Sequence, residues 1–303
     1  MSDMAQGIIG QLGEWLIAPL GNVLDAASRM YWLFWLSAIA LALAVVLIAQ
    51  WREKKCSVTR AFASLFSPHH WWRRSTLIDL GFMLGNSVLR LAVVIPLLGS
   101  HLLATLWVAR TLQSNLGNAP ELAVPGVWVA ALYTFCFFVA EDFSRFFLHR
   151  TMHKVPALWR LHKVHHSARR LTPLTLFRVH PLEMCLYYGR GLVVFGTVSG
   201  SFVYLFGSQL SGWDVLGVDA LGFAFNFFGA NLRHSHVWLS FGPLERWFIS
   251  PAGHQLHHSR LPAHRDKNFG TCLSLWDRLA GSHLPAGARR PRLAFGLSGV
   301  RSS

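Results

Sequence analysis

Residues 141–167 read EDFSRFFLHRTMHKVPALWRLHKVHHS, and this stretch contains one HxxxH motif and one HxxHH motif. A second HxxHH motif begins at residue 254. Residues at positions i, i+3 and i+4 project from one face of a helix, so each motif can direct two or three imidazoles towards one point. The stretch therefore predicts helices with clustered histidines, and the eight residues concerned are His149, His153, His162, His165, His166, His254, His257 and His258.

Eight clustered imidazoles indicate a transition-metal site rather than solvated surface histidines. Neutral imidazole is a ligand that suits zinc, copper and iron. A single tetrahedral zinc ion needs only four ligands. Two metal ions that share eight or more nitrogen ligands fit the number of motif histidines better, so we predict a di-metal centre.

Four further residues are candidates for the same site. His234 and His236, in the segment NLRHSH at 231–236, are candidate ligands that follow an apolar stretch directly. His180 is a candidate for a role behind the ligands or against the substrate. Asp142 lies two helical turns before the first motif, on the same helix face, and could accept a hydrogen bond from a ligating imidazole. The alternative for Asp142 is an ion pair with Arg145.

The composition indicates a membrane protein. Hydrophobic residues make up 52% of the 303 residues and charged residues 14%, whereas a soluble domain carries about 25% charged residues. Residues 31–50 contain no charge, which is enough for one crossing of a bilayer. We predict an all-helical, multi-pass fold with about four to six transmembrane helices, formed by apolar stretches at 31–50, 76–109, 124–148, 186–207 and 214–232. Glycines 189, 191, 196 and 200 should allow close helix packing in the fourth stretch.

The basic residues are distributed unevenly along the chain. Of the 28 lysines and arginines, 25 lie in the segments 51–74, 145–190 and 233–303. The positive-inside rule places these segments in the cytoplasm, and all the histidine motifs with them. The net charge of +14 then fits a membrane surface, and nothing in the chain resembles a nucleic-acid recognition motif. We expect a bacterial inner membrane, because the chain is short and ends without a retrieval signal.

Several blocks of sequence, taken together, resemble a known family. Residues 141–167 show an acidic residue, an aromatic, HRxxH and then LWxxHxxHHS. The segments RVHPLE at 178–183 and SPAGHQLHHSRLPAHRDKNFGTCLSLWDRLAGSH at 250–283 continue the pattern. Over residues 130–285 the chain resembles the fatty acid hydroxylase/sterol desaturase superfamily.

The resemblance implies a specific chemistry. Members of this superfamily use a non-haem centre of two iron ions and O2 to hydroxylate or desaturate lipids. The substrate stays open among sterol-like, fatty acyl, sphingolipid and ether lipids. The chain shows no glycine-rich dinucleotide motif and no CxxC pair among its four cysteines. Electrons are therefore expected from a separate redox partner of the cytochrome b5, ferredoxin or reductase type.

We expect four regions along the chain: an interfacial helix at 1–30, membrane helices at 31–130, a catalytic domain at 131–285 with a membrane hairpin at 186–232, and a disordered tail at 286–303. A metal transporter or sensor and an inactive scaffold of the same superfamily remain alternatives. A transporter should carry polar residues in the middle of several membrane helices. Only Arg90 and Asn86 qualify, and Arg90 is expected to pair with Asp79. A zinc hydrolase would need a general base such as the glutamate of HExxH, which the sequence lacks.

Overall fold

A computed structural model describes residues 21–297, apart from residue 121 and the segments 208–213 and 216–217. The described residues are mostly helical, which confirms the predicted fold class. Their single sheet is a short antiparallel hairpin of β1 (Asp214–Val215) and β2 (Val218–Asp219). Most of the expected N-terminal helix, the expected turn at 208–213 and the last six residues lie outside the described parts of the chain.

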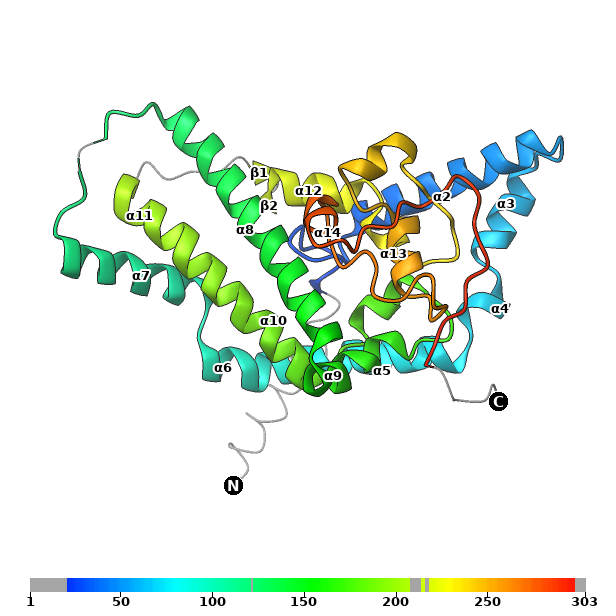
Figure 1. Cartoon of the computed structure of the whole chain (residues 1–303), viewed down its shortest axis with the longest axis horizontal. Coiled ribbons are helices and arrows are strands. Elements are labelled where there is room, and N and C mark those ends of the chain that lie inside the picture. Colours follow the sequence, from blue (N-terminus) through cyan, green and yellow to red (C-terminus); the bar gives the residue numbers. More distant parts are fainter. Residues whose placement is uncertain (1–20, 121, 208–213, 216–217, 298–303) are drawn as a thin grey trace, which may run out of the picture.

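Three helical segments form a bundle at one end of the molecule, on the left of Figure 1. The third segment contacts both of the others, and it is continuous although a π-helical turn, η3, interrupts its α-helical pattern. The segments are α7 (His101–Leu116), α8 (Gly126–Lys154), and α10 (Pro181–Val194) with η3 (Phe195–Ser199) and α11 (Gly200–Phe206).

Small residues explain how α7 and α11 approach each other. A Cβ atom added at Gly200 would lie 2.7 Å from Cβ of Val108 and 2.9 Å from the carbonyl oxygen of Thr105. One at Gly196 would lie 3.3 Å from Val108. Glycine permits this spacing because it has no side chain. The predicted role of glycine in close packing is thus confirmed for these two positions, whereas no described atom lies within 4 Å at Gly189.

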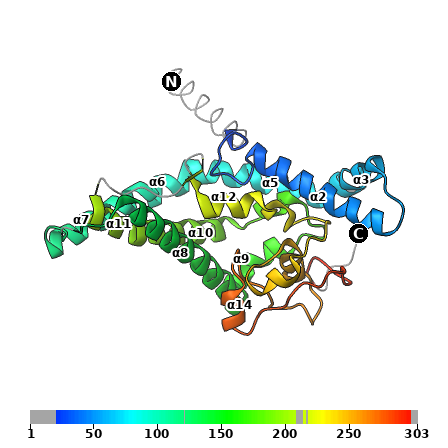
Figure 2. The ribbon, with the colours of Figure 1, turned by 90° about the horizontal axis from the view of Figure 1, so that it is seen from above.

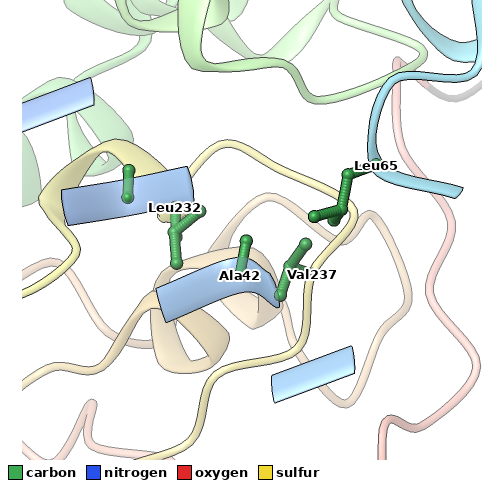
Figure 3. Packing of buried hydrophobic residues seen from close by; sticks show 5 residues of the cluster. Ala42, Leu65, Leu232 and Val237 are labelled. Atoms are coloured by element: carbon green, nitrogen blue, oxygen red, sulfur yellow. The ribbon is translucent and has the colours of Figure 1, made fainter. Parts of the chain in front are cut away.

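The N-terminal helices pack along the part of the molecule that carries the histidines (Figures 1 and 2). Figure 3 shows a buried apolar cluster in which Ala42 of α2 meets Leu65 of α3, Leu232 and Val237. These last two residues flank the candidate ligand His234. The helices are α2 (Trp32–Arg52), α3 (Val58–Leu65), α4 (Pro68–Trp71) and α5 (Arg74–Leu89), and α5 continues through the π-helical η1 (Arg90–Val94) into α6 (Ile95–Leu98).

Short helices and loops hold the remaining histidines. Helix α13 begins after Ser250, which is its N-cap because the Ser250 hydroxyl accepts a hydrogen bond from the backbone N–H of Gly253 at 3.0 Å. The elements of this region are α9 (Pro156–His166), η2 (Pro173–Phe177), α12 (Ala220–Phe227), η5 (Ala230–Leu232), η6 (Gly242–Arg246), α13 (Pro251–His257) and α14 (Leu275–Leu279).

Four helical segments are long and apolar enough to cross a membrane, namely residues 32–52, 74–116, 126–154 and 181–206. They correspond to the first four predicted stretches. The second of them is broken at Gly99, which adopts a φ of 79°. In the fifth predicted stretch, 214–232, the one described α-helix is α12, which has eight residues. At about 1.5 Å per residue this helix is too short to cross a bilayer.

Two further expectations were wrong. Residues 286–297 are not a detached tail: Ala286 is buried against Leu256, and the carbonyl oxygen of Ala294 accepts a hydrogen bond from the backbone N–H of Arg260. Asp79 does not pair with Arg90. Its carboxylate binds Arg178 at 2.5 Å and Thr175 at 2.9 Å, which ties α5 to η2.

Candidate metal centre

Nine histidines come together in two groups, and within each group one ring nitrogen of every residue lies within 4.8 Å of the others. These nine are the eight motif histidines and His234. Group A consists of His149, His153, His162, His166 and His257. Group B consists of His165, His234, His254 and His258.

The paired histidines of each HxxHH motif are divided between the two groups. His165 belongs to group B and His166 to group A, and His258 and His257 are divided in the same way. Consecutive residues of a helix point in directions about 100° apart, so one helix end can serve two neighbouring sites. The groups are in contact, because the ring of His166 stacks on the ring of His258 with centroids 4.6 Å apart.

The Nε2 atoms of group B face one another. The Nε2 atom of His234 lies 3.2 Å from that of His165, 3.0 Å from that of His258 and 3.1 Å from that of His254. In a neutral imidazole only one nitrogen carries a proton. Four such atoms converging on one point therefore suit a shared cation better than a set of mutual hydrogen bonds.

In group A, too, Nε2 atoms of different histidines face one another, and several of these nitrogens lack a hydrogen-bond partner among the described residues. The Nε2 atoms of His149 and His162 are 3.1 Å apart. Those of His153, His166 and His257 are buried and have no hydrogen-bond partner within the described chain. Buried polar atoms without a partner are costly and call for a bound ion or water.

The spacing fits metal ligation. A metal–nitrogen distance of about 2.1 Å places two ligand nitrogens about 3.0 Å apart at a right angle and about 3.4 Å apart at the tetrahedral angle. The Nε2–Nε2 distances of 3.0–3.2 Å in both groups lie within this range. Each group therefore could hold one transition-metal ion, with iron, zinc and copper all compatible with the imidazole donors.

Contacts at the other ring nitrogen orient several of these imidazoles. The Nδ1–H of His149 donates to the carbonyl oxygen of Phe269 at 2.7 Å, and that of His257 donates to Lys267 at 2.8 Å. The Nδ1–H of His162 donates to the carboxylate of Glu183, also at 2.7 Å. Such bonds fix the tautomer that leaves Nε2 free for a metal.

His254 differs from these three. The guanidinium of Arg233 donates from Nη2 to Nδ1 of His254 at 2.8 Å. Arg233 also donates to the carbonyl oxygen of Gly270 at 3.1 Å. Because Nδ1 of His254 accepts the hydrogen bond from Arg233, Nε2 carries the ring proton in the metal-free chain, and a metal ion bound at Nε2 would displace that proton.

Burial keeps the ligand candidates neutral. Burial, reinforced by the neighbouring histidines, lowers the pKa of His162, His166, His257 and His258 well below the usual value of 6.5. Burial likewise lowers the pKa of His165 to about 4. Neutral imidazole is the form that binds a metal, so the set is ready for metal binding at neutral pH.

The structure places three of the other candidates elsewhere. His236 joins neither group, and its ring packs against that of His70 with centroids 4.1 Å apart. His180 is the N-cap of α10, where its Nδ1 atom accepts a hydrogen bond from the backbone N–H of Leu182 at 3.1 Å. The prediction for Asp142 was wrong in both forms, because its carboxylate binds neither a ligand histidine nor Arg145.

Asp142 instead anchors the loop that follows the third motif. Its carboxylate accepts hydrogen bonds from the backbone N–H groups of Cys272 and Leu273, at 2.7 and 3.0 Å, and from the indole of Trp276. Asp277 braces the same loop by accepting from the N–H groups of Phe269 and Gly270. These bonds position the Phe269 carbonyl that orients a ligand histidine.

The sequence reasoning missed Glu183. Its carboxylate is 1% exposed and its second oxygen, Oε2, has no described partner. The signal was present in the RVHPLE block at 178–183, where a glutamate stands in the first turn of an apolar helix. The spacing of the histidines gave no hint of it, because the contact with His162 joins two different helices.

Two cavities border the metal groups from different sides. One, of about 300 Å³, is lined by His153, His166 and His257 together with Trp159 and Arg265, and residues near the C-terminus also line it. The other, of about 500 Å³, touches His149 and His162 of group A and three histidines of group B. Residues of α5 and α10, from two of the four candidate membrane spans, line this larger cavity.

Comparisons with known proteins agree with this geometry. The family model for fatty acid hydroxylases matches residues 134–282. An ornithine lipid hydroxylase of Rhizobium tropici is 30% identical over 158 residues, which are 52% of this chain and 44% of that protein. Human alkylglycerol monooxygenase is 26% identical over 174 residues, 57% of this chain and 34% of its own. A Delta(7)-sterol 5(6)-desaturase of Eremothecium gossypii is 29% identical over 174 residues, 56% and 42% of the two chains.

The similarity therefore spans less than half the length of each of these relatives. No solved structure matches the chain. The matched region nevertheless contains all nine histidines of groups A and B, together with Glu183 and the loop braced by Asp142 and Asp277. Residues 134–282, which contain the candidate metal centre, therefore match the fatty acid hydroxylase family.

Proposed function

We propose that this protein hydroxylates or desaturates an unactivated C–H bond of a lipid, using O2 at a histidine-ligated centre of two iron ions. The observation that carries the proposal is the pair of buried histidine groups whose Nε2 atoms face one another at 3.0–3.2 Å. The similarity to a lipid hydroxylase, a monooxygenase and a sterol desaturase supports lipid oxidation rather than metal transport.

In this proposal groups A and B hold one iron ion each. The bound ions supply the activation of O2 and the oxidation of carbon. The protein's own residues keep the imidazoles neutral by burial and orient them through Glu183, the Phe269 carbonyl and the Lys267 carbonyl. All members of both groups except His153 are buried, so the residues around them exclude bulk water.

The larger cavity suits the lipid substrate, and the smaller one suits a redox partner. The larger one opens between α5 and α10 and includes Met83, Phe177 and Met184, so it offers apolar surface to a lipid. The smaller one is bordered by Arg260 and Arg265 and offers a route for electrons. The ring of Trp159 lies 5.0 Å from the ring of His153 and could carry electrons towards group A. An acidic redox protein of the cytochrome b5, ferredoxin or reductase type fits this basic face.

We further propose that the protein resides in a bacterial inner membrane with both histidine groups on the cytoplasmic side. The distribution of basic residues supports this orientation, because 25 of the 28 lie in segments that the positive-inside rule assigns to the cytoplasm. A cytoplasmic centre would also be accessible to soluble electron donors.

The decisive experiment compares the lipids of cells that express the wild type with those that express a His257→Ala/His258→Ala double variant. This variant removes one ligand candidate from group A and one from group B. A His264→Ala variant is the matched control, because His264 belongs to neither group. The host should be a bacterium that supplies substrate and electron donor, and total lipids are measured by mass spectrometry.

We expect one lipid class to gain one oxygen, or to lose two hydrogens, with the wild type and the control but not with the double variant. The purified wild type should contain two iron ions per chain, measured by elemental analysis. Identical lipid profiles in cells whose wild-type protein is folded and iron-loaded would contradict lipid oxidation. A change in cellular metal content without any change in lipids would favour a metal transporter or sensor instead.

A further inference from the structure

The larger cavity beside the metal groups is unusually rich in arginine. Four arginines line it, namely Arg29, Arg90, Arg145 and Arg233. The same cavity borders His149 of group A and His234 of group B. A lipid that reaches the metal centre through this cavity therefore meets several guanidinium groups on its way.

The described carboxylates do not neutralise these arginines. Asp25 and Glu183 are the acidic residues among those that line the cavity. Glu183 accepts the Nδ1–H of His162, and Asp25 is exposed and accepts a backbone N–H from Ala27. Glu141 pairs with Arg145, but it also binds Arg190 at 3.0 Å, so one carboxylate serves two cations.

Arg29 and Arg90 pair with no carboxylate of the described residues, and Arg29 is the more buried of the two. The guanidinium of Arg29 lies over the ring of Phe225 at 5.2 Å. The guanidinium of Arg233 lies 5.6 Å from the same ring, so Phe225 has two cations near it. Burial and these neighbouring arginines lower the pKa of Arg29 to about 9. A second positive charge beside a half-buried arginine is unfavourable unless an anion balances it.

We propose that this cavity binds the acidic end of the lipid substrate, a carboxylate or a phosphate, and that Arg29 is the residue that recognises it. Guanidinium groups bind both anions through paired, charge-assisted hydrogen bonds. The inference rests on the proposed function, because it names the substrate class of the same site. Since one cavity borders both Arg29 and the metal groups, the oxidised carbon should lie in the part of the lipid next to its acidic group.

Binding of defined lipids to the purified, iron-loaded protein in detergent tests the proposal without requiring turnover. The probes share a sixteen-carbon chain and differ at the polar end: palmitate, palmitoyl lysophosphatidic acid and the neutral hexadecanol. The variants are Arg29→Gln, which removes the charge, and Arg29→Lys, which keeps it. Arg110→Gln is the control, because Arg110 borders a different cavity on α7. Iron content and thermal stability are measured for every variant.

We expect the wild type to bind at least one acidic probe about tenfold or more tightly than hexadecanol, as a charge-assisted contact should provide. Arg29→Gln should lose this preference, Arg29→Lys should keep part of it, and Arg110→Gln should keep all of it. A preference for palmitate alone would identify a carboxylate, and one for lysophosphatidic acid alone a phosphate headgroup.

Equal affinity of the wild type for all three probes would overturn the proposal, and so would an acid preference that survives in Arg29→Gln. The wild-type comparison decides the matter even if Arg29→Gln fails to fold. The two proposals fail in distinguishable ways: oxidation of neutral lipids alone would refute the acidic headgroup and leave the oxygenase function intact. Absence of any lipid oxidation by the loaded enzyme would refute the oxygenase function itself.

Discussion

Glu183 is a buried carboxylate that orients one of the ligand histidines. Its carboxylate is buried in the first turn of α10 and accepts the Nδ1–H of His162 at 2.7 Å. A carboxylate in this position fixes the ring orientation and makes the imidazole a stronger ligand. The positive end of the α10 dipole favours a negative charge there. Glu183 therefore should contribute to metal affinity although it touches no metal itself.

Replacing Glu183 by alanine should weaken iron binding in group A by about 10-fold to 100-fold, the usual cost of removing such a partner. Glu183→Gln keeps an oxygen that can accept the same bond, so its loss should be clearly smaller. Competition with a chelator of known affinity measures both variants against the wild type. Equal iron affinity in Glu183→Ala and the wild type would show that the contact with His162 does not support ligation.

The lowered pKa values of the histidines predict how stability depends on pH. When a group has a lower pKa in the folded chain than in the unfolded chain, only the unfolded chain takes up its proton as the pH falls. His165 has a folded pKa of about 4 against 6.5 when unfolded. Burial also lowers the pKa well below 6.5 for six other histidines outside the membrane spans: His162, His166, His234, His254, His257 and His258.

The metal-free protein should therefore lose stability as the pH falls from 6.5 towards 4. Each such histidine reduces the free energy of unfolding by up to about 1.4 kcal/mol per pH unit in this window. Above pH 6.5 these histidines do not make the free energy of unfolding depend on pH. Urea unfolding in detergent, followed between about pH 7.5 and about pH 5, measures the effect before most carboxylates titrate. An unfolding midpoint that stays constant over this range would contradict the assigned burial of the histidines.

The ligand candidates themselves were largely predictable from the sequence. The spacing of the motifs predicted eight of the nine grouped histidines, and His234 was recognised from its place after an apolar stretch. The spacing did not predict which imidazole joins which group, because that depends on how α9 and α13 approach each other. Nor did it predict the role of Asp142, whose partners lie about 130 residues further along the chain.

At the scale of elements, the contact between α7 and α11 is the tightest one between helices that carry no ligand. Gly200→Ala should destabilise the protein by about 1–3 kcal/mol, because its new methyl group would collide with Val108 and the Thr105 carbonyl. Gly189→Ala is the matched control in the same segment. Outside the neighbouring residues and backbone of its own helix, no described atom lies within 4 Å of its Cβ position, so this change should be neutral or slightly stabilising.

Thermal unfolding of both variants in the same detergent provides the comparison. Iron content should stay unchanged in both, since neither glycine lies near the histidine groups. If Gly189→Ala proved as harmful as Gly200→Ala, backbone flexibility rather than close packing would explain the glycines of this helix.

The membrane helices were predictable from the sequence, but the π-helical turns that interrupt two of them were not. Hydropathy located four of the five apolar stretches with bounds that differ from the observed helices by up to seven residues, because composition alone determines it. The π-helical turns at 90–94 and 195–199 depend on tertiary contacts that no local pattern shows. Likewise, the stretch 214–232 is apolar enough for a membrane arm, but its described residues form only the short helices α12 and η5 and the paired strands β1 and β2.

At the scale of the whole molecule, the position of α2 is the least expected feature. A helix of 21 residues is about 32 Å long and could cross a bilayer. Its first end, however, lies at the metal centre: Arg29 borders the same cavity as His149, and the Asn231 side chain donates to the Arg29 carbonyl at 3.1 Å. Its other end borders a second cavity beside His236. Residues near both ends of α2 thus line cavities that also border the histidine-bearing region.

We therefore expect α2 to lie along this region, with its outer face in lipid, rather than across the bilayer. Its buried residues, such as Phe34, Ala38 and Ala42, face the protein, and exposed apolar residues on the other side can enter the membrane surface. Residues before and after α2 should then be on the same side of the membrane. The positive-inside rule assigns residues 51–74 to the cytoplasm, so residue 27 should be cytoplasmic too.

Labelling with a membrane-impermeant maleimide in intact and permeabilised cells tests this arrangement. Cys56 is exposed in the wild type and serves as the site after α2, while Ala27→Cys in a Cys56→Ser background serves as the site before it. We expect both to react only after permeabilisation. Ser114→Cys lies in the last turn of α7, at the start of a stretch without basic residues (111–123), and should react in intact cells, which would confirm that the reagent reaches the outer face. If residue 27 reacts in intact cells while Cys56 does not, α2 crosses the bilayer. Arg29 could then not lie beside the metal region, and the proposed anion site would be wrong.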